Sequence, residues 1–118
     1  MANFRTYRVW TLAHELTLAV YSKTRDFPTE ERYGLVRQLR RSAAAILANL
    51  AEGLGKSSDR EKARYADIAL GSSYELDYHL LLSRDLQYLE DGDYSELLTI
   101  VTSVKKMLHR LRRRLLDS

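Results

Sequence analysis

Few residues of this chain combine the type and the spacing that enzyme chemistry requires. Glu75 and His79 stand four residues apart, so they share one face of a helix and could hold one ligand between them. A di-iron site in a helical bundle instead needs Glu-x-x-His on two helices, and no glutamate of this sequence has a histidine three residues further on. We interpret Glu75 and His79 as a surface pair of a helix and predict no metal site.

Motifs for nucleophiles and nucleotides are also incomplete. The sequence has no cysteine, which excludes thiolate catalysis, and no serine stands in a Gly-x-Ser-x-Gly motif. Residues 53–57 read GLGKS, like the end of a phosphate-binding loop, but Leu50 occupies the position of that loop's first glycine. We therefore assign no catalytic residue and no cofactor.

Two groups of basic side chains are stronger candidates for a binding site. One lies between Tyr33 and Ala51, a stretch without acids, and the other lies within residues 105–114, which also lack acids. Because guanidinium groups bind phosphate oxygens in pairs, these groups predict a basic surface for RNA or DNA made of Arg37, Arg40, Arg41, Lys105, Lys106, Arg110, Arg112, Arg113 and Arg114. The alternative is that the acids of residues 85–96 pair with these cations and that the terminal arginines only complement a helix dipole.

Asn49 and Glu52 form a third candidate, one helical turn apart among apolar residues. A polar group in apolar surroundings needs a hydrogen-bond partner, which favours a structural role in which both side chains bond to helix ends or to Arg40 and Arg41. Together with Gly53, where the helix is expected to stop, they mark an architectural or interface contact. The alternative is a polar pocket around Asn49 and Glu52 that supports an enzyme activity.

Helices must position these candidates. With 118 residues, one proline, 45% hydrophobic and 30% charged residues, the composition favours a single all-α domain over residues 1–118. Apolar residues at helical spacing predict helices over about 7–26, 33–54, 59–89 and 94–116, the last with an apolar repeat of 3.5 residues. Ser58 and Glu61 form a capping box before the third helix, and Asp93 with Glu96 fits a cap before the fourth. Short loops between four such helices predict an antiparallel up-down-up-down four-helix bundle.

The helix predicted over 33–54 is apolar on most sides of its second half. Such a helix is buried by more than one neighbour, so we expect it to contact both the bundle core and a second subunit. Gly71 and Ser72 in the following helix are expected to allow close packing against it. The sequence has neither a long apolar run nor a signal-peptide layout, so we expect a cytoplasmic protein without a membrane partner.

Several segments of the sequence match a known family in order. They are Tyr7–Trp10, Phe27-Pro28 with Glu30-Glu31, Tyr33–Leu35, Gln38–Ala43, Asn49–Gly53, Ala69–Ser72 and Tyr74–Leu76. With them the chain resembles, over nearly its whole length, the bacterial four-helix-bundle proteins encoded by intervening sequences in 23S ribosomal RNA genes, and their free-standing homologues. It departs from that pattern at Leu47, where the family often has proline, so the second helix is expected to run straighter here.

The resemblance implies an antiparallel four-helix bundle that assembles into a ring of five subunits and has no accepted enzymatic activity. A more distant relative, the accessory protein of diversity-generating retroelements, is likewise pentameric and binds nucleic acid and a reverse transcriptase. We therefore expect a non-enzymatic homopentamer that acts as a binding or scaffold module, with RNA or DNA bound through the arginine-rich surface. The alternative is a protein–protein adaptor that binds no nucleic acid.

Overall fold

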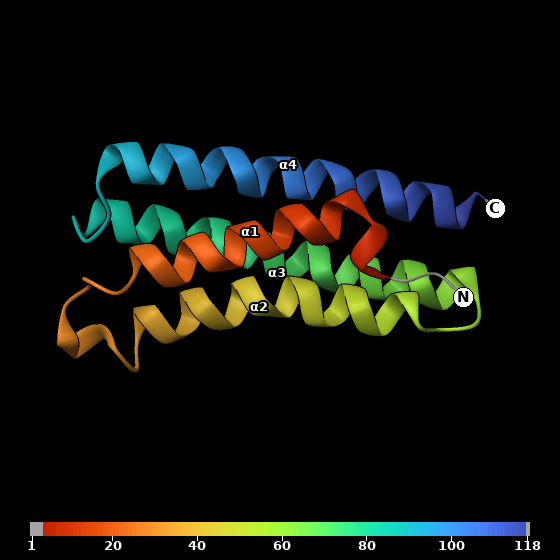
Figure 1. Ribbon diagram of the computed structural model, residues 1–118, viewed down its shortest axis with the longest axis horizontal. Coiled ribbons are helices and arrows are strands. Elements are labelled where there is room, and N and C mark those ends of the chain that lie inside the picture. The colour runs from red at the N-terminus through yellow and green to blue at the C-terminus, as the bar shows by residue number, and fades with distance from the viewer. Residues whose placement is uncertain (1–3, 118) are drawn as a thin grey trace.

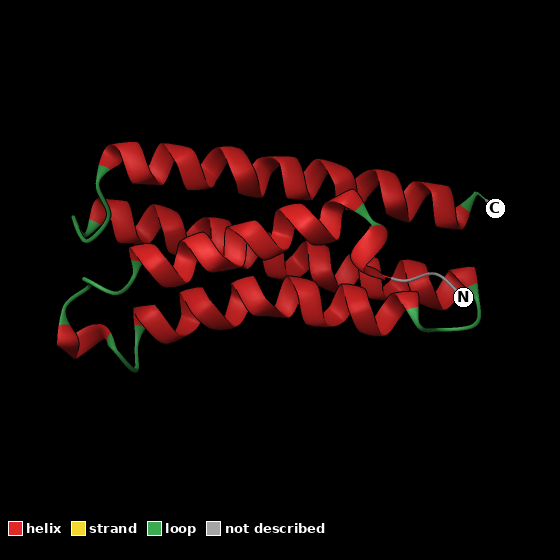
Figure 2. Ribbon diagram, viewed as in Figure 1, coloured by secondary structure: helices red, strands yellow, loops and turns green. Residues whose placement is uncertain are grey.

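The computed structural model describes residues 4–117, which form four α-helices (Figure 1). They are α1 (Arg8–Lys23), α2 (Leu35–Leu54), α3 (Asp59–Asp85) and α4 (Asp91–Leu116). Two short 3-10 helices, η1 (Phe4–Thr6) and η2 (Thr29–Glu31), precede α1 and α2. No strand occurs among residues 4–117 (Figure 2). The predicted all-α fold with four helices is therefore confirmed.

One apolar core runs along the four helices, which lie side by side in an elongated body of 45 × 23 × 20 Å (Figure 1). Every helix contributes a fully buried leucine, namely Leu16, Leu39, Leu76 and Leu108. Burial of one such side chain stabilises the fold by about 2 kcal/mol. The apolar repeat of α4 is confirmed as a core seam, because its central positions Leu97, Val101, Val104, Leu108 and Leu111 are all buried.

The junction between α1 and α2 differs from the predicted boundaries. α1 ends at Lys23 rather than at Asp26, and Thr24 closes its last turn, since the Thr24 hydroxyl and the Thr24 N–H both donate to the Val20 carbonyl. α2 begins at Leu35 rather than at Tyr33, because a carboxylate oxygen of Glu31 accepts the N–H of Leu35 at 3.2 Å. Glu31 therefore replaces the missing side-chain cap at the start of α2.

The junction between α3 and α4 also differs. α3 ends at Asp85 rather than at Leu89, because Gln87 takes a left-handed conformation (φ 65°) and the N–H groups of Tyr88 and Leu89 turn back to the Ser83 carbonyl. α4 starts at Asp91, so the predicted cap at Asp93 is wrong. Asp93 lies in the first turn instead, where the helix dipole favours a carboxylate. The predicted cap of α3 is confirmed, since Ser58 Oγ accepts the N–H of Glu61 at 3.1 Å.

Gly53 of α2 and Gly71 of α3 have opposite environments. A Cβ atom at Gly53 would lie 2.3 Å from the Cβ of Tyr65, so only glycine allows this close approach of the two helices. At Gly71 an added Cβ would meet no atom within 4 Å. The expectation that Gly71 packs closely against α2 is therefore wrong, because Gly71 lies on the exposed side of α3.

None of the helices described has the length and hydropathy that a membrane-spanning helix requires.

Candidate nucleic-acid interface

Arg40 of α2 is held by contacts within the chain. It donates from Nε to Thr24 Oγ1 (3.0 Å) and from Nη2 to the Tyr21 carbonyl (3.3 Å), and its guanidinium lies 4.6 Å from the centre of the Tyr21 ring. These contacts join the start of α2 to the end of α1. Arg37, one turn earlier, is exposed and makes no ion pair with any residue from 4 to 117.

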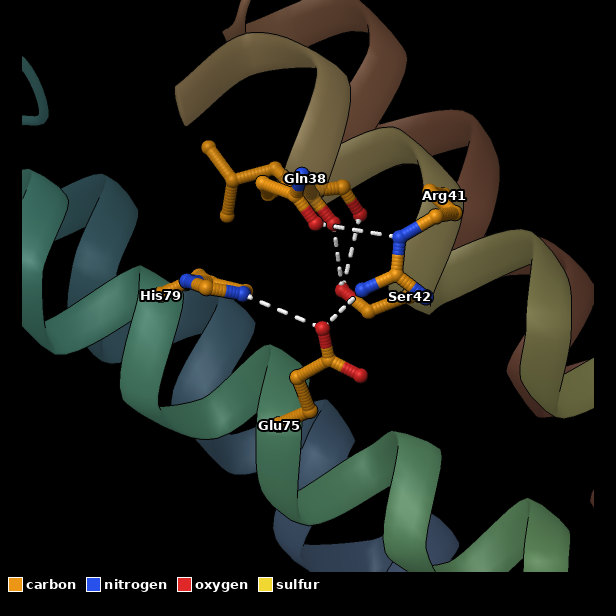
Figure 3. Close-up of polar contacts among 6 residues, drawn as sticks. Gln38, Arg41, Ser42, Glu75 and His79 are labelled. Atoms are coloured by element: carbon orange, nitrogen blue, oxygen red, sulfur yellow. Dashed lines mark hydrogen bonds and ion pairs between the residues drawn. The ribbon is translucent and has the colours of Figure 1, made fainter. Parts of the chain in front are cut away.

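Arg41 belongs to a polar cluster between α2 and α3 (Figure 3). Its Nε donates to Gln38 Oε1 at 3.0 Å, and its Nη2 binds the carboxylate of Glu75. The same carboxylate lies 3.3 Å from Nε2 of His79, so the predicted Glu75–His79 surface pair is present. Nowhere in residues 4–117 do three His, Cys, Asp or Glu side chains gather as a metal site would require. The cluster holds α2 against α3 and partly neutralises Arg41.

Two basic residues of α4 are paired with acids of α3. Lys105 binds Asp77 and lies 4.2 Å from the centre of the Tyr74 ring, and Nε of Arg112 lies 2.5 Å from Oδ1 of Asp67. These pairs fasten α4 to α3. Lys106 is exposed and has no ion-pair partner among the residues described.

The other arginines of α4 line a groove of about 790 Å³ between the end of α4 and the start of α1. We call it the arginine groove, and its lining consists of Tyr7, Arg8, Val9, Met107, Arg110, Leu111, Arg113, Arg114 and Asp117. All four arginines are exposed, and none makes an ion pair with a residue in the range 4–117. Among the described residues that line the groove, Asp117 is the single carboxylate, so this lining carries an excess of positive charge.

The start of α1 adds to this positive character. Its N-cap residue Tyr7 makes no side-chain capping bond, and its first turn contains no acid. The first N–H groups of a helix have no acceptor within the helix, and they attract anions together with the helix dipole. The C-terminal end of α4 tolerates nearby cations for the opposite reason. The C-terminal end of α4 is therefore a favourable place for arginines, and the N-terminal end of α1 is a favourable place for an anion.

The structure separates the basic residues that the sequence grouped into one surface. Arg40 contacts the last turn of α1, whereas Arg110, Arg113 and Arg114 share a groove with its first turn. The two groups thus lie toward opposite ends of α1, which spans roughly 24 Å at 1.5 Å per residue. Arg8, the first residue of α1, was not among the predicted site residues, because it comes close to α4 only in the folded chain.

The acids of residues 85–96 do not neutralise the arginine groove. Asp93 binds Lys23 at 2.8 Å, with Glu96 at 3.9 Å from the same ammonium, and Asp85 pairs with Arg84. The hydrogen bond from Lys23 to Asp93 raises the pKa of the lysine above its ordinary value. The pairs of Lys23 lie at the start of α4, at the far end of that helix from the groove, and the Arg84–Asp85 pair lies at the end of α3. The alternative in which these acids cancel the basic surface is therefore wrong for the arginine groove.

At the end of the bundle where α4 begins, a hydrogen bond also joins the α1–α2 connection to the α3–α4 connection. The Tyr88 hydroxyl donates to Oε2 of Glu31 at 3.1 Å, which raises the pKa of Tyr88. We call this region the paired end, and it consists of Tyr21, Lys23, Thr24, Glu31, Arg40, Tyr88 and Asp93.

The segment Asn49–Gly53 lies in the last turns of α2, where Gly53 packs directly against Tyr65 of α3. Asn49 donates to the carbonyl of Ala45 in its own helix at 2.8 Å, and Glu52 is exposed. The expectation that either residue bonds to Arg40 or Arg41 within the chain is wrong, because those arginines bind other partners. Neither the arginine groove nor a smaller groove of about 310 Å³ beside the start of α3 is lined by Asn49 or Glu52.

Comparison with known proteins gives one family and one fold. The model of the family described as 23S rRNA-intervening sequence protein matches residues 5–110. A solved structure of a protein with unknown function from the S23 ribosomal protein family of Bacteroides thetaiotaomicron VPI-5482 is similar, with a TM-score of 0.81 and 21% identity. That likeness covers 89% of this chain and 95% of the other and concerns the fold. No curated protein matches the sequence. Four lining residues of the arginine groove lie beyond the segment matched by the family model, namely Leu111, Arg113, Arg114 and Asp117.

Proposed function

The chain belongs to the family of 23S rRNA-intervening sequence proteins, and from this premise we propose that it is a non-enzymatic, cytoplasmic nucleic-acid-binding protein that assembles with copies of itself. In this proposal the subunit is an antiparallel up-down-up-down bundle, five subunits form a ring, and the arginine groove binds the phosphates of RNA or DNA. One observation carries it: the four arginines of the groove lie together and have no ion-pair partner within residues 4–117, whereas Arg41, Lys105 and Arg112 of the predicted basic surface each bind an acid.

The chemistry of the groove suits a polyanion. Guanidinium groups are weakly hydrated and match phosphate oxygens two at a time, and each phosphate bound releases condensed counterions. Assembly would place several identical grooves on one particle, so contacts that are weak alone would add up on one long strand. A protein with this function binds RNA with an affinity that falls steeply as salt rises.

Fluorescence anisotropy with labelled RNA and DNA between 50 and 200 mM salt tests the proposal. The affected variant carries Arg110→Gln, Arg113→Gln and Arg114→Gln, and the control carries Arg25→Gln, Arg37→Gln and Arg60→Gln at exposed positions outside the groove. We expect at least a tenfold loss of affinity in the groove variant, with the salt slope reduced by about 2 because each phosphate contact contributes about 0.7. Equal losses in both variants, or no binding by the wild type at low salt, would contradict the proposal.

Self-assembly into a ring requires two different patches on each subunit, because a closed head-to-tail contact joins unlike surfaces. One candidate patch is the outer face of α2, where Ala48 is exposed and Ala44, Ala45 and Ala51 are half-buried. The other is the outer face of α3, where Ile68, Tyr74 and Tyr78 are 40%, 52% and 58% exposed around Gly71. A glycine inside a helix costs about 1 kcal/mol of helix stability, and Gly71 gains no packing within the chain in return. A contact from a second subunit at Gly71 would offset this loss of helix stability.

Mass photometry and sedimentation velocity test the assembly. We expect the wild type to sediment as a single oligomer and Tyr78→Glu to dissociate it into folded monomers. Tyr33→Glu is the control, since Tyr33 is 77% exposed and lies in the loop before α2 rather than on α3. A monomeric wild type at micromolar concentration would rule out the ring.

A protein–protein adaptor is the second candidate function, and the same α3 patch favours it. Exposed tyrosines are frequent anchors of protein interfaces. This candidate predicts a protein that co-purifies with the wild type, is lost with Tyr78→Glu, and is retained when the three groove arginines of α4 are replaced by glutamine. Binding of RNA by the wild type together with a loss of that binding in the groove variant would favour the first candidate.

A further inference from the structure

We infer that the arginine groove takes single-stranded rather than double-stranded nucleic acid, with phosphates on the arginines and one unpaired base on the apolar floor of the groove. This inference rests on the proposed function and specifies the class of nucleic acid. It follows from how charge and apolar surface are arranged within the groove.

The rim and the floor of the groove have different characters. Arg8, Arg110, Arg113 and Arg114 are exposed and form the charged rim. Val9 and Leu111 are 5% and 4% exposed, and with the half-buried Met107 they form an apolar floor where the core reaches the surface. A site for phosphate alone would need only the rim. Val9 and Leu111 are almost covered, so it is chiefly the half-buried side chain of Met107 that offers contact area to an apolar, flat group attached to the phosphates.

The size of the groove also fits a nucleotide unit. Sites for ligands of this class have volumes of about 300 to 1,000 Å³, and the groove has about 790 Å³. Proteins that recognise single strands commonly combine a basic surface with side chains on which splayed bases stack, including arginine planes and tyrosine rings. Here four guanidinium groups and the half-buried ring of Tyr7 surround the floor.

A double helix would use this groove poorly. Its phosphates lie on a convex surface and its bases stay stacked inside, so it would touch the exposed arginines and leave the floor covered by water. A single strand can turn one base toward the floor while its neighbouring phosphates reach the rim. Removal of water from the floor therefore contributes to the binding of a single strand and contributes little to that of a duplex.

Binding to four matched oligonucleotides of twelve residues tests the inference at 150 mM salt. They are a single-stranded RNA, a single-stranded DNA, the corresponding DNA duplex, and a single-stranded DNA whose bases are replaced by abasic sites. We expect both single strands with bases to bind at least tenfold more tightly than the duplex and the abasic strand. Equal affinity for duplex and single strand, or for abasic and normal strand, would overturn the inference and leave the proposed function standing. Binding of none of the four would remove both.

Met107 gives a direct probe of the groove floor. The sequence contains two methionines, so a protein labelled with 13C at the methionine methyl groups gives two methyl signals. A base on the groove floor shifts the Met107 signal by the ring current of that base, whereas phosphate alone does not. We expect this shift with single-stranded DNA and not with the abasic strand, and Met107→Leu assigns the signal and keeps an apolar floor. Displacement of the single strand by polyglutamate at equal charge, with no ring-current shift, would identify the groove as a general polyanion site and overturn the inference.

Discussion

The paired end and the arginine groove differ in whether their charged side chains have bonding partners within the chain. At the paired end, Lys23 binds Asp93, Arg40 binds Thr24 and the Tyr21 carbonyl, and Tyr88 donates to Glu31. In the groove, four arginines stand around one carboxylate without an ion pair within residues 4–117. At the paired end, side-chain bonds link the helices and their loops. In the groove, α1 and α4 lie side by side, and no ion pair of the four arginines links them.

This difference suggests that the paired end contributes to the stability of the fold and the arginine groove to binding. The hydrogen bonds of a cation that is bonded within the chain stabilise the fold. Removal of that cation leaves its acceptor groups without a donor. A cation without a partner adds little to the fold, and clustered like charges oppose one another. We therefore expect substitutions at the paired end to change the free energy of unfolding and substitutions in the groove to change the affinity for nucleic acid.

The largest effect on stability is expected at Glu31. Its carboxylate caps α2 through the Leu35 N–H and accepts the Tyr88 hydroxyl, so Glu31→Ala removes a helix cap and a link between two loops. We expect a loss of about 2 kcal/mol in the free energy of unfolding, since a cap alone contributes about 1 kcal/mol. Urea denaturation followed by circular dichroism measures it. Glu30→Ala is the matched control at an exposed neighbour, and a similar loss in both variants would show that the two bonds of Glu31 are not the cause.

Arg40 and Arg37 provide the next test, because they lie one turn apart on α2. Arg40→Lys keeps the charge and loses the forked geometry that reaches both Thr24 and the Tyr21 carbonyl. We expect a loss of about 1 kcal/mol in unfolding free energy for Arg40→Lys. For the exposed Arg37→Lys we expect a change within about 0.5 kcal/mol. Equal changes at the two positions would contradict the assignment of Arg40 to the fold.

The sequence predicted the architecture better than the site. Apolar spacing in α3 and α4 is set by local geometry, so buried positions such as Leu76 and Leu108 could be identified from the sequence alone. The start of α3 could also be identified, from Ser58 and Glu61, but the start of α2 and the end of α3 could not, because Glu31 and Gln87 act through a side-chain cap and a left-handed turn that depend on the partner loop.

The arginines show the same limit. Arg41 and Arg114 are equivalent in the sequence as members of basic stretches, yet Arg41 binds Glu75 across two helices and Arg114 lies in the groove. Pairing is decided by residues distant in the chain, and Arg8 enters the groove only because α1 and α4 meet there.

A smaller effect on stability is expected in the groove itself. Arg113→Gln with Arg114→Gln removes two charges that complement the dipole of α4 but repel the neighbouring arginines. These contributions have opposite signs and each amounts to a few tenths of a kcal/mol, so we expect the unfolding free energy to stay within about 0.5 kcal/mol of the wild type. The same denaturation experiment measures it. A loss as large as that of Arg40→Lys would place these arginines with the paired end and break the comparison.

The smallest effect concerns Lys23 and its dependence on pH. The hydrogen bond to Asp93 raises the pKa of Lys23 in the folded state above the value of about 10.4 expected in the unfolded chain. A raised pKa means that the folded state holds this proton more tightly, so the contribution to stability is complete below pH 10.4 and is lost as the pH rises through the folded pKa. We expect Lys23→Met to lower Tm slightly at pH 7 to 9 and to differ progressively less from the wild type above pH 10.4. Lys106→Met is the matched control, because Lys106 is exposed and unpaired among the residues described, and its Tm should equal that of the wild type at every pH. A difference between Lys23→Met and the wild type that persists unchanged to pH 12 would mean that the lysine stem, and not its bond to Asp93, supports the paired end.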